Sequence, residues 1–141
     1  MTTFAASTAQ SLPRNADLAA VLLRVTSGGL FIAHALLKVV VFTPAGTAGY
    51  FQSIGLPGFL AYVVIAAELL GGLALIAGFK TRIVALALIP VLLGAAWFGH
   101  AANGFFFSNA NGGWEYPVFW AVTLAVQALL GAGAYSADNR A

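Results

Sequence analysis

Four long apolar segments, separated by polar or glycine-rich connections, dominate the hydrophobicity pattern of this chain. Each is close in length to the roughly 20 apolar residues that a helix needs to cross the core of a bilayer. The pattern predicts an all-α fold, an integral membrane four-helix bundle with spans at residues 18–37, 59–79, 83–99 and 117–134. We expect a disordered N-terminal tail (1–15), a membrane domain (16–136) and a short C-terminal tail (137–141).

The second predicted span carries one carboxylate, Glu68, near its middle, among side chains that are otherwise almost all apolar. An ionised group at this depth is costly in a bilayer, so Glu68 must face protein, water or a partner group. Two compatible interpretations are open: Glu68 neutralises a basic residue on a neighbouring helix, or it handles protons or a ligand. Gly71 and Gly72, which follow it, would let another helix approach closely.

The polar residues of the first span fall on one helical face at 100° per residue. We expect this face to point into the bundle, and it consists of Arg24, Ser27, Phe31, His34 and Lys38. Arg24 lies about 10 Å inside the start of the span, counted at 1.5 Å per residue, whereas Lys38 lies near the opposite surface. We therefore predict a structural ion pair between Arg24 and Glu68, which would make both charges tolerable.

The connections between spans also predict structure. Residues 38–58 are rich in Gly and Pro; Thr43-Pro44 is a good helix start and Gly55 a good stop, which predicts a short helix in the membrane interface. Only residues 80–82 separate the second and third spans, so these should form an antiparallel hairpin. Residues 101–116 hold five aromatic side chains among Asn and Gly, which indicates an aromatic loop over one end of the bundle.

Composition supports a membrane protein, because 61% of the residues are hydrophobic and 7% are charged, against about 25% charged in soluble domains. The net charge of +2 is too small and dispersed for nucleic-acid binding. Without cysteine, this chain alone builds no disulfide, iron–sulfur cluster or thiolate zinc site. We expect the first span to be retained, not cleaved. One side of the membrane would hold four basic residues, Arg14, Lys80, Arg82 and Arg140, and the other side only Lys38. This distribution predicts that both termini lie in the cytoplasm.

The candidate chemistry gathers at the outer ends of the spans. His34 and His100 lie at similar depths in two spans that run the same way, and Lys38, Asn103, Trp114, Glu115 and Tyr116 belong to the same end. Three interpretations are open. The histidines tie down the aromatic loop by binding loop carbonyls and Glu115, or the cluster binds a flat amphipathic ring such as a quinone, or the histidines ligate haem. Haem is disfavoured because nothing else demands a porphyrin, and no metal-binding or phosphate-binding motif is present.

The chain resembles the DoxX family of small four-span membrane proteins. The resemblance rests on six motifs in order: HALLK at 34–38, IGLPG at 54–58, AELLGG at 67–72, GFKTR at 78–82, NGFF at 103–106 and GGWEYP at 112–117. The family often has Gly where this chain has Ala35. The resemblance implies a four-helix bundle in the bacterial cytoplasmic membrane, and the family name comes from the membrane subunit of a thiosulfate:quinone oxidoreductase. By matching position it selects His34, Lys38, Glu68, Arg82, His100 and residues 112–117. The lack of cysteine argues against covalent handling of sulfane sulfur.

From these observations the leading hypothesis is a membrane subunit of a quinone-linked oxidoreductase. The catalytic candidates are Glu68, His34 and His100, and the ligand-binding candidates are Lys38, Asn103, Trp114, Glu115 and Tyr116. The suspected cofactor is a quinone, and the partners would be the lipid bilayer and another oxidoreductase subunit. The alternative is a non-catalytic membrane anchor for a soluble redox enzyme, and a third idea is a carrier for a small anion or aromatic. Glycine-rich faces on the second and fourth spans allow a homodimer.

Overall fold

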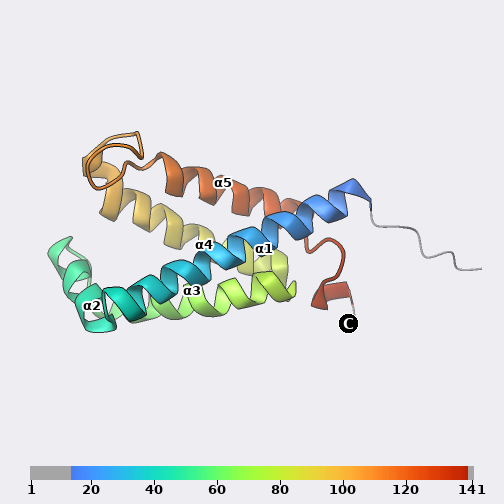
Figure 1. Cartoon of the computed structure of the whole chain (residues 1–141), viewed down its shortest axis with the longest axis horizontal. Coiled ribbons are helices and arrows are strands. Elements are labelled where there is room, and N and C mark those ends of the chain that lie inside the picture. Colours follow the sequence, from blue (N-terminus) through green and yellow to red (C-terminus); the bar gives the residue numbers. More distant parts are fainter. Residues whose placement is uncertain (1–13, 140–141) are drawn as a thin grey trace, which may run out of the picture.

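The computed structural model describes residues 14–139, and these residues form an all-helical bundle without strands (Figure 1). Three helices are long and apolar enough to cross a membrane, counted with their extensions as Asn15–Val41, Phe59–Ala77 and Thr81–Asn103. A fourth apolar helix is shorter. In chain order the elements are α1 (Asn15–Leu36), the π-helix η1 (Leu37–Val41), α2 (Pro44–Ser53), α3 (Phe59–Ala77), α4 (Thr81–Gly94), the π-helix η2 (Ala95–His100), the 3₁₀ turn η3 (Ala101–Asn103), α5 (Glu115–Leu130) and the 3₁₀ turn η4 (Ala137–Asn139).

The predicted elements are found, with changes at their ends. α1 starts three residues before the predicted span, at Asn15, where the Asp17 carboxylate accepts the backbone N–H of Arg14. α2 confirms the predicted short helix, since the Thr43 hydroxyl accepts the N–H of Gly46. The predicted N-terminal tail lies outside the described residues up to position 13. In the predicted C-terminal tail, residues 137–139 form a helical turn and the last two positions lie outside the description.

The fourth span is shorter than predicted, because α5 ends at Leu130 and not at Ala134. Gly131 and Gly133 have φ values of +84° and +67°, a backbone region that suits glycine and ends a helix. The segment after α5 turns back along the end of the bundle. Residues 131–134 are apolar by composition, so hydropathy alone extended the span too far.

Two glycines set the register between α1 and α3. A Cβ added at Gly28 would lie 2.6 Å from the carbonyl oxygen of Gly72, and one at Gly72 would lie 2.7 Å from that of Gly28. The two backbones therefore touch, as in other membrane helix pairs with small residues at the contact. The predicted close approach of a helix at Gly72 is confirmed, and at Gly71 the neighbour is the Leu88 side chain of α4.

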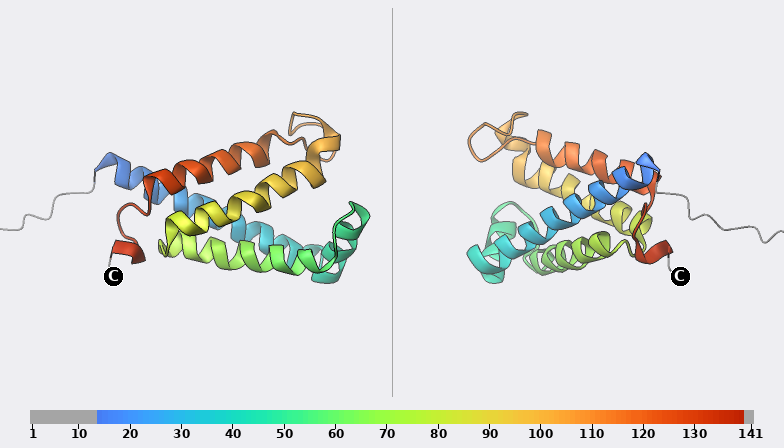
Figure 2. Two further views of the ribbon diagram at one scale, coloured as in Figure 1. Left: turned by 180° about the vertical axis from the view of Figure 1, so that it is seen from behind. Right: turned by 45° about the vertical axis from the view of Figure 1, so that its right-hand side comes forward.

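The helices diverge from one end of the bundle to the other. α1 packs along α3 and α4 packs along α5, and the views agree that the two pairs spread apart away from the turn between α3 and α4 (Figures 1 and 2). We call the open end the α2 end; it contains residues 37–58 and 95–114. We call the opposite end the tail end; it contains residues 14–20, 78–82 and 131–139. The described chain starts and finishes at the tail end (Figure 1). The two ends of the described chain thus lie at the same end of the bundle as the 80–82 loop, as an arrangement of four antiparallel spans requires.

Arg24 holds the tail end together and does not reach Glu68, so the predicted Arg24–Glu68 pair is wrong. Arg24 is 2% exposed, and within residues 14–139 its guanidinium donates to backbone carbonyls only. Nη1 binds Leu75 and Ile76 in the last turn of α3, with 3.1 Å to Leu75. Nε and Nη2 bind carbonyls that follow α5, those of Ala132 (2.9 Å), Ala134 (3.1 Å) and Tyr135 (2.9 Å). All five guanidinium hydrogens are thus matched with acceptors.

The register explains this correction. Gly72 lies against Gly28 and Ile32, and because the helices are antiparallel, Glu68, four residues before Gly72, lies beyond Ile32 towards the end of α1. Arg24 and Ile32 are already eight residues, about 12 Å, apart along α1, so Arg24 is too far from Glu68 for direct contact. The predicted pair relied on the depth of each residue counted from the expected ends of its span, and that count does not include the shift of α1 along α3.

Asp138 from the tail caps the start of α4. Its carboxylate accepts the backbone N–H groups of Lys80 (2.6 Å) and Thr81 (3.0 Å), two donors that the first turn of a helix leaves unpaired. The pKa of Asp138 lies below its ordinary value of 3.8: desolvation acts to raise it, but the hydrogen bonds from Thr81 and Lys80 outweigh that effect. The ionised form therefore stabilises the folded tail end.

We expect Asp138→Asn to lower the stability of the protein slightly at neutral pH. A carboxyl group with a lowered pKa in the folded state stabilises it above the unfolded pKa and loses this effect as the pH falls through the folded pKa. Because Asp138 is exposed, the effect should stay below about 1 kcal/mol. Thermal unfolding in detergent would show a difference between wild type and variant that shrinks below about pH 4. A difference independent of pH would contradict this role.

Candidate functional site

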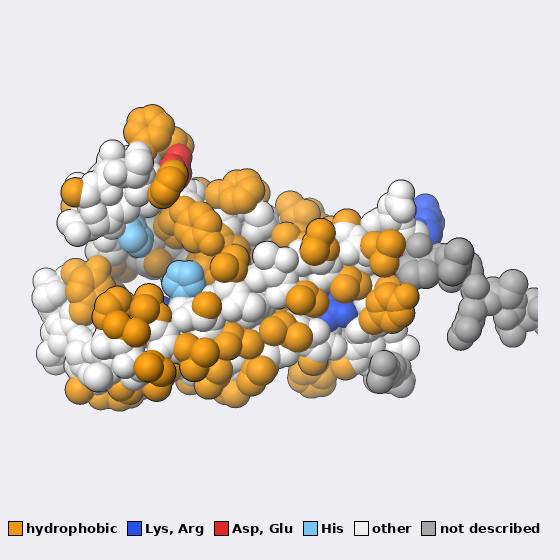
Figure 3. All heavy atoms as spheres, viewed as in Figure 1, with side chains coloured by type: hydrophobic (Ala, Val, Ile, Leu, Met, Phe, Trp, Pro, Cys, Tyr) orange, Lys and Arg blue, Asp and Glu red, His pale blue; other side chains and the backbone are white. Residues whose placement is uncertain are grey.

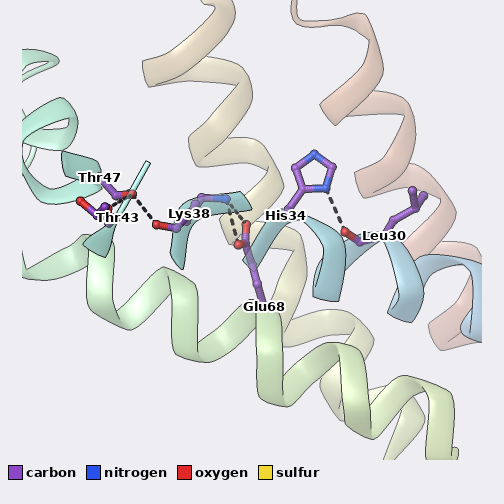
Figure 4. A network of polar contacts seen from close by, with 6 residues as sticks. All are labelled: Leu30, His34, Lys38, Thr43, Thr47 and Glu68. Carbon is purple, nitrogen blue, oxygen red and sulfur yellow. Dashed lines mark hydrogen bonds and ion pairs between the residues drawn. The ribbon is translucent and has the colours of Figure 1, made fainter. Parts of the chain in front are cut away.

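Lys38 and Glu68 form an ion pair between α1's π-helical extension and α3. The Lys38 ammonium lies 2.9 Å from both Glu68 carboxylate oxygens, and the side chains are 18% and 7% exposed, respectively. Lys38 lies less than about 9 Å further along α1 than the level of Glu68, a distance that its flexible side chain covers by bending back towards the bundle interior. Figure 4 shows the ammonium directed at the carboxylate. The prediction that Glu68 neutralises a basic residue is confirmed, with Lys38 as the partner.

His34 lies one turn before Lys38 and contacts α5. Its Nδ1 is 2.9 Å from the Leu30 carbonyl oxygen, and since a carbonyl only accepts, Nδ1 carries a hydrogen and Nε2 is left for another partner. The imidazole centroid is 5.4 Å from that of Trp120, whose ring also packs on Phe31 at 4.3 Å. Tyr116 adds a ring 5.9 Å from Trp120. His34 thus belongs to an aromatic wall beside the ion pair.

The π-helical turn η1 and α2 position the base of Lys38. A hydrogen bond from the Phe42 N–H to the Leu37 carbonyl (3.0 Å) widens this turn. The Thr47 hydroxyl of α2 lies 2.9 Å from the Thr43 carbonyl and 3.3 Å from the Lys38 carbonyl, and Thr47 is buried (Figure 4). These contacts fold α2 back against η1, so that both segments surround the Lys38 stem.

The aromatic loop has its own polar network, which we call the loop cluster: His100, Asn103 and Glu115. His100 Nδ1 and Asn103 Nδ2 bind the Gly112 carbonyl at 2.9 and 3.0 Å. A Glu115 oxygen accepts the N–H of Phe107 at 2.8 Å. The Trp114 ring packs edge-on against Phe105 at 4.7 Å. Three predicted site residues therefore fasten the loop, as the structural interpretation expected for His100, although His100 binds a carbonyl and not Glu115.

The sequence predicted one convergent cluster, and the structure divides it into two. His34, Lys38 and Glu68 are together on α1 and α3, whereas the loop cluster lies over α4 and α5. Among residues 14–139 no hydrogen bond joins the two groups. Figure 3 shows a hollow at the α2 end with the two histidine side chains of the chain beside it. Its two sides belong to the two diverging helix pairs.

Two apolar grooves lie at this end, and sequence reasoning missed both. One, about 450 Å³, is lined by Lys38, Phe42, Gly46, Thr47, Tyr50 and Phe51, and we call it the α2 groove. The other, about 460 Å³, is lined by Phe105, Phe107, Trp114, Glu115, Tyr116, Val118 and Phe119. Only the aromatic side chains of these segments hinted at them. The contact of Trp120 with His34 was also missed, since the two lie on helices far apart in sequence.

Comparison with known proteins agrees with this architecture. The DoxX family model matches residues 19–101, more than half of the chain. The chain is 43% identical over 79 residues to CatD of Bacillus subtilis (strain 168), whose name carries a provisional assignment as an oxidoreductase; the match covers 56% of this chain and 58% of that protein. It is 32% identical over 127 residues to the inner membrane protein YqjF of Escherichia coli (strain K12), covering 79% and 90%.

An uncharacterized protein of Haemophilus influenzae (strain ATCC 51907 / DSM 11121 / KW20 / Rd) is 33% identical over 120 residues, covering 84% of this chain and 87% of that protein. No solved structure matches the chain. The family match covers the helices that carry Lys38, Glu68 and His34. This chain belongs to the DoxX family.

Proposed function

We propose that this protein is the membrane subunit of a quinone-linked oxidoreductase and that it binds a quinone, or a similar flat aromatic carbonyl compound, at the Lys38–Glu68 pair. The name of CatD, which carries a provisional assignment as an oxidoreductase, agrees with this class of function. The name of YqjF supports a bacterial inner membrane location. The distribution of basic residues favours a cytoplasmic tail end and an outer α2 end.

One observation carries the proposal: the Lys38 ammonium has a hydrogen to spare. An ammonium carries three hydrogens, and the two Glu68 oxygens at 2.9 Å take two of them. The Lys38 side chain is 18% exposed and lines the α2 groove. The third hydrogen is therefore available to a carbonyl oxygen of a ligand beside the α2 groove. An ion pair that only stabilised the fold would not need an ammonium group that a ligand can reach.

The surrounding residues suit the reduction of such a ligand. Lys38 would hold one carbonyl oxygen, and Glu68 and His34 would exchange the protons that enter as the partner subunit supplies two electrons. The Nε2 atom of His34, which has no hydrogen-bond partner within residues 14–139, fits a proton-transfer role, and the 44% exposed ring of Tyr116 offers a flat face for stacking. The π-helical turns that hold Lys38 and His100 both occur at this end, as π-turns often do at functional sites.

A second candidate is a membrane anchor for a soluble redox enzyme. It is favoured by the aromatic loop, where the polar groups are paired within the loop but Phe106 and Phe107 are 59% and 69% exposed. Exposed aromatic side chains of this kind are common where proteins meet. This candidate makes no use of the Lys38–Glu68 pair.

The test is organic extraction of the purified protein, followed by mass spectrometry for bound quinone. We expect near-stoichiometric quinone in wild type and in Lys80→Met, a matched change at the tail end. Lys38→Met should retain about one tenth or less, the effect of losing a hydrogen bond from a charged donor. Absence of quinone from folded wild-type protein, or its equal retention in Lys38→Met, would contradict the proposal and leave the anchor as the better account.

A further inference from the structure

The α2 groove has a shape and a lining that the carbonyl contact does not require. Its volume of about 450 Å³ lies within the range of roughly 300–1,000 Å³ typical of sites for drug-sized ligands, and exceeds what a single ring needs. Apart from Lys38 and the hydroxyl groups of Thr47 and Tyr50, its walls are aromatic rings and the backbone of Gly46. The Thr47 hydroxyl is already paired with carbonyls of its own segment. The groove therefore favours an apolar occupant.

The same residue connects the groove to the ion pair. Lys38 lines the groove, and its ammonium holds Glu68 at 2.9 Å. At the far side of the hollow, a methyl group added at Gly99 would lie 3.6 Å from the Tyr50 hydroxyl, so the groove wall reaches towards η2. A ligand whose polar group contacts Lys38 thus has the apolar α2 groove beside that group.

The groove also lies next to surface suited to lipid. Val40, Val41 and Phe42 are 72%, 64% and 54% exposed, and such side chains on a membrane helix face hydrocarbon. The ion pair carries no net charge, since Lys38 and Glu68 neutralise each other. A phosphate head group would meet no excess positive charge there, whereas a neutral carbonyl needs only the free ammonium hydrogen.

We propose that the ligand is a membrane-dissolved quinone with a long apolar chain, and that this chain lies in the α2 groove while the ring contacts Lys38. This inference rests on the proposed function and specifies its substrate class. The protein would take its ligand from the bilayer and not from water. Gly46 would serve the site by leaving room for the chain.

The two glycines of α2 provide a matched test. Gly46 lines the groove, and a Cβ there meets only the Thr43 hydroxyl at 3.3 Å, whereas a Cβ at Gly49 meets nothing within 4 Å. Gly46→Leu should fill the groove and Gly49→Leu should not, and both changes favour the helix similarly. The probes are a benzoquinone without a side chain and the same ring with a ten-carbon chain, titrated against the full chain in detergent with fluorescence detection.

We expect Gly46→Leu to weaken binding of the chain-bearing quinone at least about tenfold relative to the ring alone. Gly49→Leu should leave both affinities within about twofold of wild type. A photoreactive group at the end of the chain should label residues 42–51 in wild type, as mapped by mass spectrometry, and should lose this label in Gly46→Leu. Unfolding temperatures of both variants would show that the fold is kept.

The outcomes separate the two proposals. Binding of both probes with no selective effect of Gly46→Leu, and a label elsewhere, would overturn the chain-in-groove inference and leave the proposed function standing. Failure of folded wild type to bind either probe would overturn both. Displacement of the chain-bearing quinone by phospholipid at equal concentration would show that the groove is a lipid site and would also overturn the inference.

Discussion

Arg24→Met is expected to lower the free energy of unfolding by about 3–5 kcal/mol, the cost of removing one partner from a buried charged network. Its guanidinium binds five backbone carbonyls, from the last turn of α3 and from the segment after α5. Without it these carbonyls lose their donor, and the negative end of the α3 dipole loses its counter-charge. The tail end should therefore loosen first.

Arg24→Lys should recover only part of this loss. A lysine ammonium is compact and has three donors, whereas the planar guanidinium spreads five donors over both segments. The control is Arg14→Met, because Arg14 is exposed at the same end of the chain and its side chain makes no hydrogen bond among those found in residues 14–139. Unfolding in mild detergent, followed by tryptophan fluorescence, measures all three variants. If the free energy of unfolding of Arg24→Met lay within about 1 kcal/mol of the wild-type value, this role of Arg24 would be refuted.

The second large effect concerns the Lys38–Glu68 pair, where the two single changes should differ. Lys38→Met leaves the Glu68 carboxylate inside the bundle without its partner, and we expect a loss of about 3 kcal/mol. Glu68→Leu leaves a lysine near the end of the first span, and its flexible chain can swing out to the interface. Since Lys38 is already partly exposed, we expect that loss to be nearer 1 kcal/mol.

The double variant Lys38→Met/Glu68→Leu should be about as stable as wild type, because well-packed apolar residues often replace a buried ion pair without loss. A double-mutant cycle of unfolding free energies would then give a coupling of about 4 kcal/mol between the two positions, because both single losses disappear in the double variant. Additive losses would show that the two side chains do not depend on each other, against the geometry found here.

The sequence predicted those features that depend on local pattern. The apolar segments, the start of α2 at Thr43 and the hairpin at residues 80–82 follow from length, capping and connection length, and all are present. The inward face of the first span was also correct, since Arg24 and Phe31 are buried. Each of these follows from residues near one another in the chain.

Features that depend on register were missed. The partner of Glu68 is set by the Gly28–Gly72 contact, and no local pattern states how far α1 is shifted along α3. The end of α5 is set by positive φ at Gly131 and Gly133, which hydropathy does not detect. Asp138 finds the start of α4 only after the chain has folded back. The division of the predicted cluster in two follows from the divergence of the helix pairs, a tertiary property.

The measurement that tests the central claim most directly is quinone binding to the double variant Lys38→Met/Glu68→Leu, with its unfolding temperature recorded in the same preparation. The account predicts a protein that folds as well as wild type and binds the quinone ring at least about tenfold more weakly, because the ammonium hydrogen is gone. A folded double variant that binds the ring as tightly as wild type would contradict the claim that this ion pair is the binding site.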